Sequence, residues 1–329
     1  MGTVSGQGTT FNVPNYVGEL FAVTPTDTPF LSAIGGLSGG VAVDSYIHQW
    51  QTFDLRAAAQ NVALEGAAAP TAQERSRSNV VNVAQIHHEA VELSYTKLAA
   101  VGQFPTTGAG NTNALGISGM NPVRNELDWQ LEQALAQIAR DVEYSFLRGT
   151  FSDPATNATA RQTRGILSAI STNTVANAGT PLDRNDVYSA LDLIFTSGGV
   201  NDGTLTVIGN SGPILTLNDI FVEDMGAGFQ QTSRNVGGVN LTQIITPFGN
   251  VNVMLNRHMP TDQLAFVKLS ECKPFFLNIP GKGFLFAEPI GKTGAAEKVQ
   301  IYGEIGLEYG NEKSHAKITG IPAGYGYDS

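Results

Sequence analysis

The sequence predicts an α+β fold with more than one folding region, and three stretches of the chain predict it. A stretch near the middle has helical periodicity, the region after it mixes short apolar runs with helix signals, and a late stretch alternates like a strand. At 329 residues the chain exceeds what one compact core usually covers. We therefore expect two interlocked folding regions with extended arms.

The composition favours a subunit of an obligate assembly. Only 15% of the residues are charged, whereas 42% are hydrophobic and 37 are glycine. About a quarter of the residues of a typical soluble protein are charged, and surface charge keeps monomers apart in solution. A chain covered by its neighbours can do without that charge, so we expect an obligate assembly.

The net charge of −10 argues against a protein that grips nucleic acid. Binding through phosphates needs clustered Lys and Arg, which release counterions from the backbone. Packaged DNA nearby, without sequence-specific binding, remains compatible with an acidic chain.

Neither secretion nor membrane insertion is expected. Residues Met1 to Asn12 contain no basic residue and no apolar run, so they do not form a signal peptide. Residues Leu98 to Val123 contain no charge and could span a bilayer in length, but Pro105, Pro122 and several glycines make them a poor helix. We interpret this segment as a loop.

Two segments are predicted to lie outside the core. Residues 1–40 alternate Gly, Thr and Pro with isolated apolar anchors, which is typical of an extended arm. Val41 to Trp50 and Val80 to Tyr95 alternate like strands, and the excursion from Phe53 to Asn79 between them is too long for a casual connection. We expect a projecting two-stranded loop that contacts another subunit. Its candidate inter-subunit residues are Phe53, Leu55, Arg56, Val62, Leu64, Arg75 and Arg77.

The strongest helix signal runs from about Glu126 to Leu147. Apolar residues recur there at steps of three and four, polar residues such as Glu132 and Glu143 occupy other faces, and Gly149 follows the last apolar position. At 1.5 Å per residue this helix is roughly 33 Å long, the length of a domain. The residues predicted to form its buried face are Leu127, Leu131, Leu135, Ile138, Val142 and Phe146.

A second unit that mixes helices and strands is predicted after residue 180. Thr180 to Asp183 favour a helix start, and Gly198-Gly199 end that helix after Phe195, the last residue of its apolar face. A further helix is expected near Asn218 to Glu223 and a glycine-rich loop from Gly226 to Gly238. The predicted strands are Leu205 to Ile208, Leu241 to Ile245, Val251 to Leu255 and Leu264 to Leu269.

The clearest strand signal lies near the end of the chain. From Val299 to Tyr309 apolar residues hold the odd positions, whereas Glu304 and Glu308 hold even ones, which predicts one buried and one wet face. Gly310-Asn311 predicts a turn, and His315 to Ile318 a returning strand that completes a hairpin.

No motif in the sequence predicts a phosphate or metal site. Gly291-Lys292-Thr293 lacks the glycine of a phosphate-binding loop five residues earlier, where Phe286 stands. His87 and His88 point to opposite faces of a strand, and the other three histidines are scattered. We therefore assign no metal ligand and no cofactor.

Nucleophilic catalysis also has no candidate residue. There is no Gly-x-Ser-x-Gly turn. The single cysteine, Cys272, excludes an intrachain disulfide and a cysteine zinc cage, and we expect it to be a small buried apolar residue. Glu304 and Glu308 are interpreted as a surface pair rather than as an acid and a base. The sequence predicts a protein that is not an enzyme.

The order of arm, projecting loop, long helix, α/β unit and final long strand resembles the Hong Kong 97-type fold of tailed-phage major capsid proteins. Phrases along nearly the whole chain carry the resemblance to one branch of that family. They are Thr28-Pro-Phe-Leu-Ser-Ala-Ile-Gly35, Gln49-Trp-Gln-Thr-Phe-Asp-Leu-Arg-Ala57, Glu89-Ala-Val-Glu-Leu-Ser-Tyr-Thr-Lys97, Gln137-Ile-Ala-Arg-Asp-Val-Glu143 and Asn311-Glu-Lys-Ser-His-Ala-Lys-Ile-Thr-Gly320.

The resemblance implies the domain layout of that fold. It assigns residues 1–40 to the N-arm, 41–101 to the E-loop, 102–179 to the P-domain with its spine helix at about 126–147, 180–262 to the A-domain, and 263–329 to return strands that complete both domains. No helical scaffolding region precedes the arm, which implies a separate scaffolding protein or none.

The resemblance also implies the function. It implies pentamers and hexamers that close into an icosahedral head around double-stranded DNA, assembled in the bacterial cytoplasm, with portal and decoration proteins as further partners and no membrane. Two alternatives remain at this stage. One is a phage tail or adhesin subunit, and the other is an α/β enzyme with a site near residues 226–238.

Overall fold

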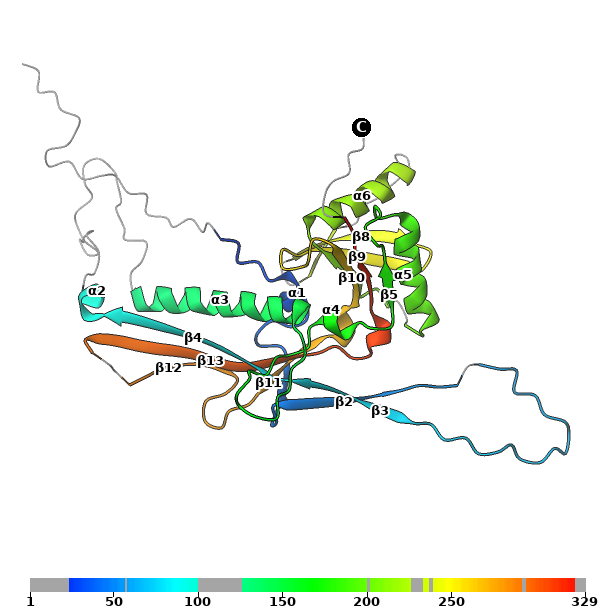
Figure 1. The fold of residues 1–329 in the computed structure, drawn as a ribbon, viewed down its shortest axis with the longest axis horizontal. Coiled ribbons are helices and arrows are strands. Elements are labelled where there is room, and N and C mark those ends of the chain that lie inside the picture. Colours follow the sequence, from blue (N-terminus) through cyan, green and yellow to red (C-terminus); the bar gives the residue numbers. More distant parts are fainter. Residues whose placement is uncertain are drawn as a thin grey trace, which may run out of the picture.

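The computed structural model describes residues 24–56, 58–99, 126–199, 202–225, 233–236, 239–291 and 294–322. They form an elongated molecule with a long helix lying along a long sheet, a second sheet with its helices at one end, and a thin ribbon that projects past the body (Figure 1). This arrangement confirms the predicted α+β class.

The long sheet is organised around β13, Ala296–Glu308. One edge of β13 pairs antiparallel with β4 (Gln85–Ser94), and its other edge pairs antiparallel with β12 (Leu285–Pro289) and then with β11 (Lys273–Leu277). The short β1 (Val41–Val43) adds to β11 in parallel. The helix α3, Glu126–Arg148, packs on β4 and β13, and the short α2, Tyr95–Ala99, lies near its start.

The second sheet has seven strands and two helices against it. Its order is β5 (Thr174–Ala176), β14 (Ala316–Thr319), β10 (Gln263–Lys268), β6 (Leu205–Gly209), β9 (Gly249–Leu255), β8 (Val239–Thr246) and β7 (Ser233–Val236). The helices α5 (Arg184–Thr196) and α6 (Ser211–Met225) contact it. Every residue of β6 is buried, because this strand runs through the middle of the sheet. Asp183 caps α5 through a complete capping box, at the predicted helix start.

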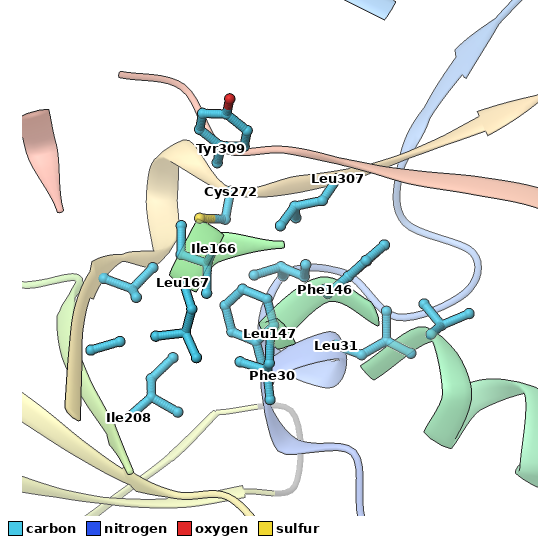
Figure 2. Packing of buried hydrophobic residues seen from close by; sticks show 14 of the residues in the cluster. Phe30, Leu31, Phe146, Leu147, Ile166, Leu167, Ile208, Cys272, Leu307 and Tyr309 are labelled. Carbon is cyan, nitrogen blue, oxygen red and sulfur yellow. The ribbon is translucent and has the colours of Figure 1, made fainter. Parts of the chain in front are cut away.

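Two hydrophobic clusters form the core. One lies between α5, α6 and the seven-stranded sheet. The other joins the C-terminal half of α3 to the long sheet, with α1 (Pro29–Ala33) and α4 (Ile166–Ala169) packed into it. Figure 2 shows Phe30 and Leu31 of α1 beside Phe146 and Leu147 of α3.

The first segment therefore departs from the expectation that residues 1–40 form an arm without a core. Phe30, Leu31 and Ile34 are buried in the larger cluster. Pro29 starts the short helix that presents them, because its fixed φ suits a first helical turn. Residues before Thr24 lie outside the described residues.

The long helix is confirmed, but part of its predicted buried face is wrong. Ile138, Val142 and Phe146 are buried, and Leu127 and Leu131 are half-buried. Leu135 is 41% exposed, because the sheet packs mainly against the C-terminal half of the helix. Glu143, predicted on a polar face, is completely buried.

Both of the early strands predicted as single are broken. The chain bends after β1 and continues as β2, Ile47–Phe53, in a different sheet. The later segment divides at Ala84 into β3, Arg77–Val83, and β4. Ala84 is buried at this break, and its N–H donates to the Tyr46 carbonyl at 2.7 Å. That hydrogen bond replaces the ladder contact which the break removes.

The expected final hairpin is wrong. The strand β13 belongs to the long sheet, whereas β14 pairs with β10 and β5 in the other sheet. Between them the turn carries a short 3-10 helix, Glu312–Ser314, and the buried His315. His315 Nε2 donates to the Tyr309 carbonyl at 2.8 Å, and its Nδ1 accepts the Lys268 N–H at 3.0 Å.

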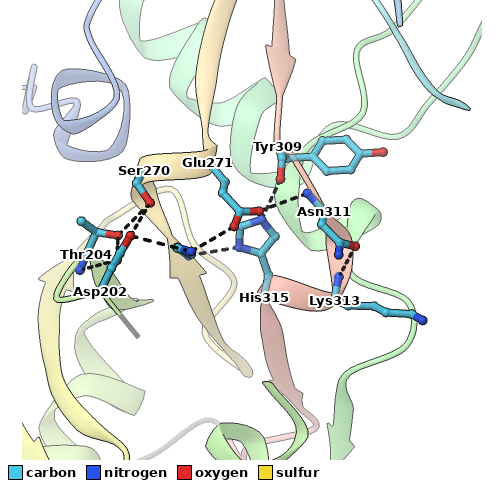
Figure 3. Close-up of polar contacts among 9 residues, drawn as sticks. Asp202, Thr204, Ser270, Glu271, Tyr309, Asn311, Lys313 and His315 are labelled. Carbon is cyan, nitrogen blue, oxygen red and sulfur yellow. Dashed lines mark hydrogen bonds and ion pairs between the residues drawn. The ribbon is translucent and has the colours of Figure 1, made fainter. Parts of the chain in front are cut away.

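Further polar contacts fix this crossing between the two sheets (Figure 3). Glu271, at the end of the 3-10 helix Leu269–Glu271, accepts the Asn311 N–H at 3.2 Å and pairs with Lys268. Lys268 also lies 3.7 Å from Asp202. Local periodicity predicts each strand here, but only these distant partners decide which sheet it joins.

The remaining differences concern particular elements. The helix expected near Asn218 extends over all of α6, and the loop expected at residues 226–238 contains β7. Phe195, expected on the buried face of α5, is 68% exposed. The strands β5, β11 and β12 were not predicted, because each is short or interrupted by proline and lacks clear alternation.

Candidate assembly surface

The ribbon of β2 and β3 is the most exposed part of the described chain. The two strands pair antiparallel from Ile47 opposite Val83 to Phe53 opposite Arg77. The loop beyond them, residues 54–76 without Ala57, projects away from the body (Figure 1). Among the described residues, the turn at Ala67 contains the only backbone hydrogen bond of this loop outside the strand ladder.

Large apolar side chains stand in water along this projection. Phe53 is 69% exposed, Leu55 65%, Val62 82% and Leu64 85%. All four were predicted from the sequence as inter-subunit residues. Removing apolar area from water contributes roughly 25 cal/mol per Å², so covering these side chains with another surface would be favourable.

The charged residues predicted for this surface are exposed as well. Arg56, Arg75 and Arg77 all face solvent, and Arg77 donates to the Gln51 side chain at 3.1 Å. Asp54 lies 3.6 Å from Lys313, which belongs to the turn after β13. These groups leave the loop both charged and apolar, as the rim and centre of a protein interface are.

The base of the ribbon, in contrast, is fixed to the body. Trp50 Nε1 donates to the Gly310 carbonyl at 2.7 Å, and its ring meets the Tyr309 ring edge-on at 5.0 Å between centroids. His48 Nε2 lies 2.9 Å from Glu308. Both contacts join β2 to the end of β13.

Asn82 on β3 completes this anchorage. Its side chain is buried, and its Nδ2 donates to the carbonyls of Leu307 at 2.6 Å and Arg164 at 3.1 Å. Its Oδ1 accepts the Arg164 N–H at 2.7 Å. A fully satisfied buried amide holds the strand in one register, so the ribbon leaves the body in a fixed direction.

A second polar cluster lies where β3 passes into β4. Arg161 forms an ion pair with Glu304 and donates from Nε to the Ala84 carbonyl at 2.8 Å. The Tyr302 hydroxyl donates to Glu304 at 2.7 Å, and burial together with this bond raises the pKa of Tyr302 to about 12. The expectation that Glu304 lies on a wet face is wrong, because the 150–165 segment covers that side of β13. Its ion-pair partner is 143 residues away, so no local pattern could have indicated it.

Exposed apolar residues also gather on the seven-stranded unit. Phe195 at the end of α5 and Phe248 at the turn between β8 and β9 lie 6.1 Å apart between ring centroids. Ile245 on β8 and Leu255 at the far end of β9 are also more than half exposed. The subunit therefore carries exposed apolar side chains on the seven-stranded unit as well as on the ribbon.

The cysteine and the histidines considered from the sequence are not brought together into a metal-binding group in the described ranges. Cys272 is buried as expected, and burial raises the pKa of its thiol. Those ranges contain no group of three or more His, Cys, Asp or Glu that could hold a metal ion. His87 is buried while His88 is exposed beside Gln300, so the two rings do point apart.

Parts of the sequence interpretation fall outside the described residues. They are Lys292 and Thr293 of the rejected phosphate loop, residues 226–232 of the glycine-rich segment and residues 100–125 of the uncharged segment. Among the helices of the described ranges, none combines the length and the hydropathy that a bilayer crossing requires.

The fold combines a long helix on a long sheet, an α/β unit at one end and an anchored ribbon with an apolar tip. Solved structures share this fold. A cyanophage A-1(L) capsid subunit aligns with a TM-score of 0.64 at 10% identity over 97% of this chain and 99% of that one. The capsid of a native GTA particle gives 0.63 at 13% identity, covering 96% and 97%. An encapsulin from Synechococcus elongatus gives 0.60 at 10% identity, covering 97% and 95%.

The sequence itself decides the family. Residues 3–322 match the family model described as SU10 major capsid protein, and the chain belongs to that family. No curated protein matches the chain by sequence. The chain is therefore a major capsid protein of bacteriophage type, a structural subunit of a virion shell that assembles with its own copies. The family decides against the alternative of a tail or adhesin subunit.

Proposed function

We propose that this chain forms pentamers and hexamers that close into an icosahedral head around double-stranded DNA, and that it catalyses no reaction. The observation that carries the proposal is the contrast along the β2–β3 ribbon. Its base is fixed by buried hydrogen bonds, while Phe53, Leu55, Val62 and Leu64 at its far end remain in water.

The ribbon then lies across a neighbouring subunit. Interfaces between rotated copies close into rings, and each subunit is held by several neighbours, so many moderate contacts act together. A preformed ribbon loses less entropy on docking than a flexible one, because its direction is already fixed. The contacts at Trp50 and Asn82 serve this purpose.

Other partners follow from the same proposal. Separate scaffolding, portal and decoration proteins contribute to the head, which is assembled in the bacterial cytoplasm. The DNA lies beside an acidic chain without sequence-specific binding. Within the subunit we propose the N-arm at residues 1–40, the E-loop at 41–101, the P-domain at 102–179, the A-domain at 180–262 and return strands at 263–329. The seven-stranded sheet supports the A-domain assignment, and the buried α1 supports a junction between arm and body near residue 30.

The test replaces residues Leu55 to Ser76 with a short Gly/Ser linker and keeps all seven β2–β3 pairs. Circular dichroism with thermal melting measures the fold, and sedimentation with electron microscopy measures shells, with scaffolding protein supplied if assembly requires it. We expect melting close to the wild type and no shells.

Point variants sharpen the test. Val62→Ser with Leu64→Ser removes two exposed apolar side chains and should reduce assembly, whereas Gln60→Ser with Gln73→Ser changes polar residues of the same loop and should not. Normal shells from the linker variant would show that the ribbon does not fasten subunits.

A further inference from the structure

One carboxylate in the described chain is buried without a cation. Glu143 lies on α3 and is completely buried. Its Oε1 accepts the Phe30 N–H at 2.9 Å and its Oε2 accepts the Leu31 N–H at 2.6 Å. The side-chain Nδ2 of Asn256 donates to the same Oε1 at 2.5 Å. These described partners are all neutral donors, although burying a charge usually requires a charged partner.

The three donors come from two parts of the chain that are far apart in sequence. Phe30 and Leu31 belong to α1, where the N-terminal segment joins the body. Asn256 directly follows β9 and is completely buried. It is itself fixed, because its N–H donates to the Gly209 carbonyl at 2.8 Å and its Oδ1 accepts the His258 N–H at 2.9 Å. One carboxylate thus connects the N-terminal segment, the long helix and the seven-stranded sheet.

The surroundings of Glu143 favour its neutral form. Burial raises the pKa of Glu143 to about 6, and the nearby negative charge of Asp27 acts in the same direction, against the three hydrogen bonds. Asp27 itself pairs with Arg257 at 3.2 Å. The other charged or titratable groups at this junction are His258 on the loop after β9 and Arg140, Asp141 and Arg148 on α3. Within these ranges none of them forms an ion pair with Glu143.

We propose that Glu143 is a proton-dependent latch that positions the N-terminal segment. It holds the first turn of α1 against α3 and Asn256, and this hold becomes stronger when the carboxyl group takes up a proton. If α1 detached from α3, the carboxyl group of Glu143 would be exposed to water and would bind its proton less tightly. By linkage, the docked state is therefore favoured as the pH falls. The latch belongs to the single subunit and does not rest on the proposed assembly.

The test is hydrogen exchange of the peptide that covers Phe30 and Leu31, measured by mass spectrometry on the purified full chain between pH 7.5 and 5. Exchange is corrected for its intrinsic pH dependence. We expect protection in the wild type to rise by roughly 5- to 10-fold toward pH 5. A change of this size follows if the pKa of Glu143 is about 6 while α1 is docked and returns to its ordinary 4.5 when the carboxyl group is in water. Protection that stays flat over this range would overturn the proposal.

Three variants separate the latch from general packing. Glu143→Gln cannot titrate, so its protection should be lower and independent of pH. The control Glu132→Gln, an exposed residue of the same helix, should keep the wild-type slope. A wild-type slope in Glu143→Gln would contradict the latch.

If Glu143→Gln does not fold, Asn256→Ala gives a second test. Removing the Asn256 donor takes away a bond that lowers the pKa of Glu143. The rise in protection should therefore begin at a higher pH than in the wild type. An unchanged midpoint would overturn the proposal, and because every measurement is made on the free subunit, a failure of shell assembly would not imitate this result.

Discussion

The indole of Trp50 donates from Nε1 to the main-chain carbonyl of Gly310, 2.7 Å away, and so joins the projecting ribbon to the end of β13. Gly310 has a φ of 61°, in the left-handed region that glycine adopts without strain. The Gly310 carbonyl that accepts the indole N–H therefore lies in a backbone turn that residues other than glycine adopt only with strain.

The first prediction concerns this bond. Trp50→Phe keeps an aromatic ring beside Tyr309 but leaves the Gly310 carbonyl without its donor. We expect the free energy of unfolding to fall by about 1–2 kcal/mol. Urea denaturation of the purified subunit measures this change. Gln49→Ala, at an exposed position of the same strand, is the matched control and should change stability by less than about 0.5 kcal/mol. Equal losses in the free energy of unfolding of the two variants would show that this hydrogen bond does not contribute to stability.

The second prediction compares four positions on α3. Ile138→Asp places a carboxylate in the larger hydrophobic cluster and should abolish soluble folded protein, at a cost of about 3–5 kcal/mol. Leu131→Asp should cost less, because Leu131 is only half-buried at the edge of that cluster.

Leu135→Asp and Glu132→Ala serve as tolerated controls, since both side chains are exposed. Soluble yield and melting temperature distinguish the variants. If Leu135→Asp unfolded the subunit as Ile138→Asp does, the burial pattern of the helix would be different from the one described.

The sequence predicted those elements whose signal is local. The period of α3, the alternation of β13 and the caps of α5 are properties of neighbouring residues, and all three elements were found. The exposed apolar tip of the ribbon was also predictable, because a long excursion between two strands has no room in a compact core. Pairing was harder. Nothing between Tyr309 and His315 indicates that β13 and β14 belong to different sheets.

The buried polar residues were the other failure of prediction. Glu143 and Glu304 occupy positions that helical and strand periodicity assign to water. Each is buried because of partners more than one hundred residues away, at Phe30 and Asn256 for the first and at Arg161 for the second. A periodic pattern records which residues share a face but not what covers that face, so contacts of this kind become visible only in the folded chain.

The third prediction uses two glycines with opposite surroundings. A Cβ atom at Gly306 would lie 2.2 Å from the ring of Phe275, which is completely buried. Gly306→Ala should therefore destabilise the subunit by about 1–3 kcal/mol or more. A Cβ atom at Gly212, in α6, would meet nothing within 4 Å. Gly212→Ala should leave the fold intact and stabilise it by up to about 1 kcal/mol through helix propensity. Thermal melting measures the stability of both variants. A destabilised Gly212→Ala would contradict the open space at that position.

The last prediction concerns pH. His87 on β4 is buried, and its Nε2 has no hydrogen-bond partner among the described residues. Burial lowers the pKa of His87 to about 4, below its ordinary value of 6.5. Between these two values the unfolded chain binds the proton more readily than the folded one. The contribution of His87 to the free energy of unfolding is therefore complete at pH 7 and is lost as the pH falls below 6.5. Glu143, whose pKa is raised, acts in the opposite direction over the lower part of this range.

His87→Leu removes the titrating ring and leaves an apolar side chain in its place. Between pH 7 and pH 5 the free energy of unfolding of this variant should fall by about 2 kcal/mol less than that of the wild type. Urea denaturation at several pH values measures the difference, and His88→Gln, at the exposed neighbouring position, should follow the wild type. Glu143→Gln should deviate the other way and lose about 1 kcal/mol more than the wild type over the same interval. If His87→Leu and the wild type lost the same amount, the ring would not be held neutral against the helix, and the acid sensitivity of the subunit would have to come from other groups.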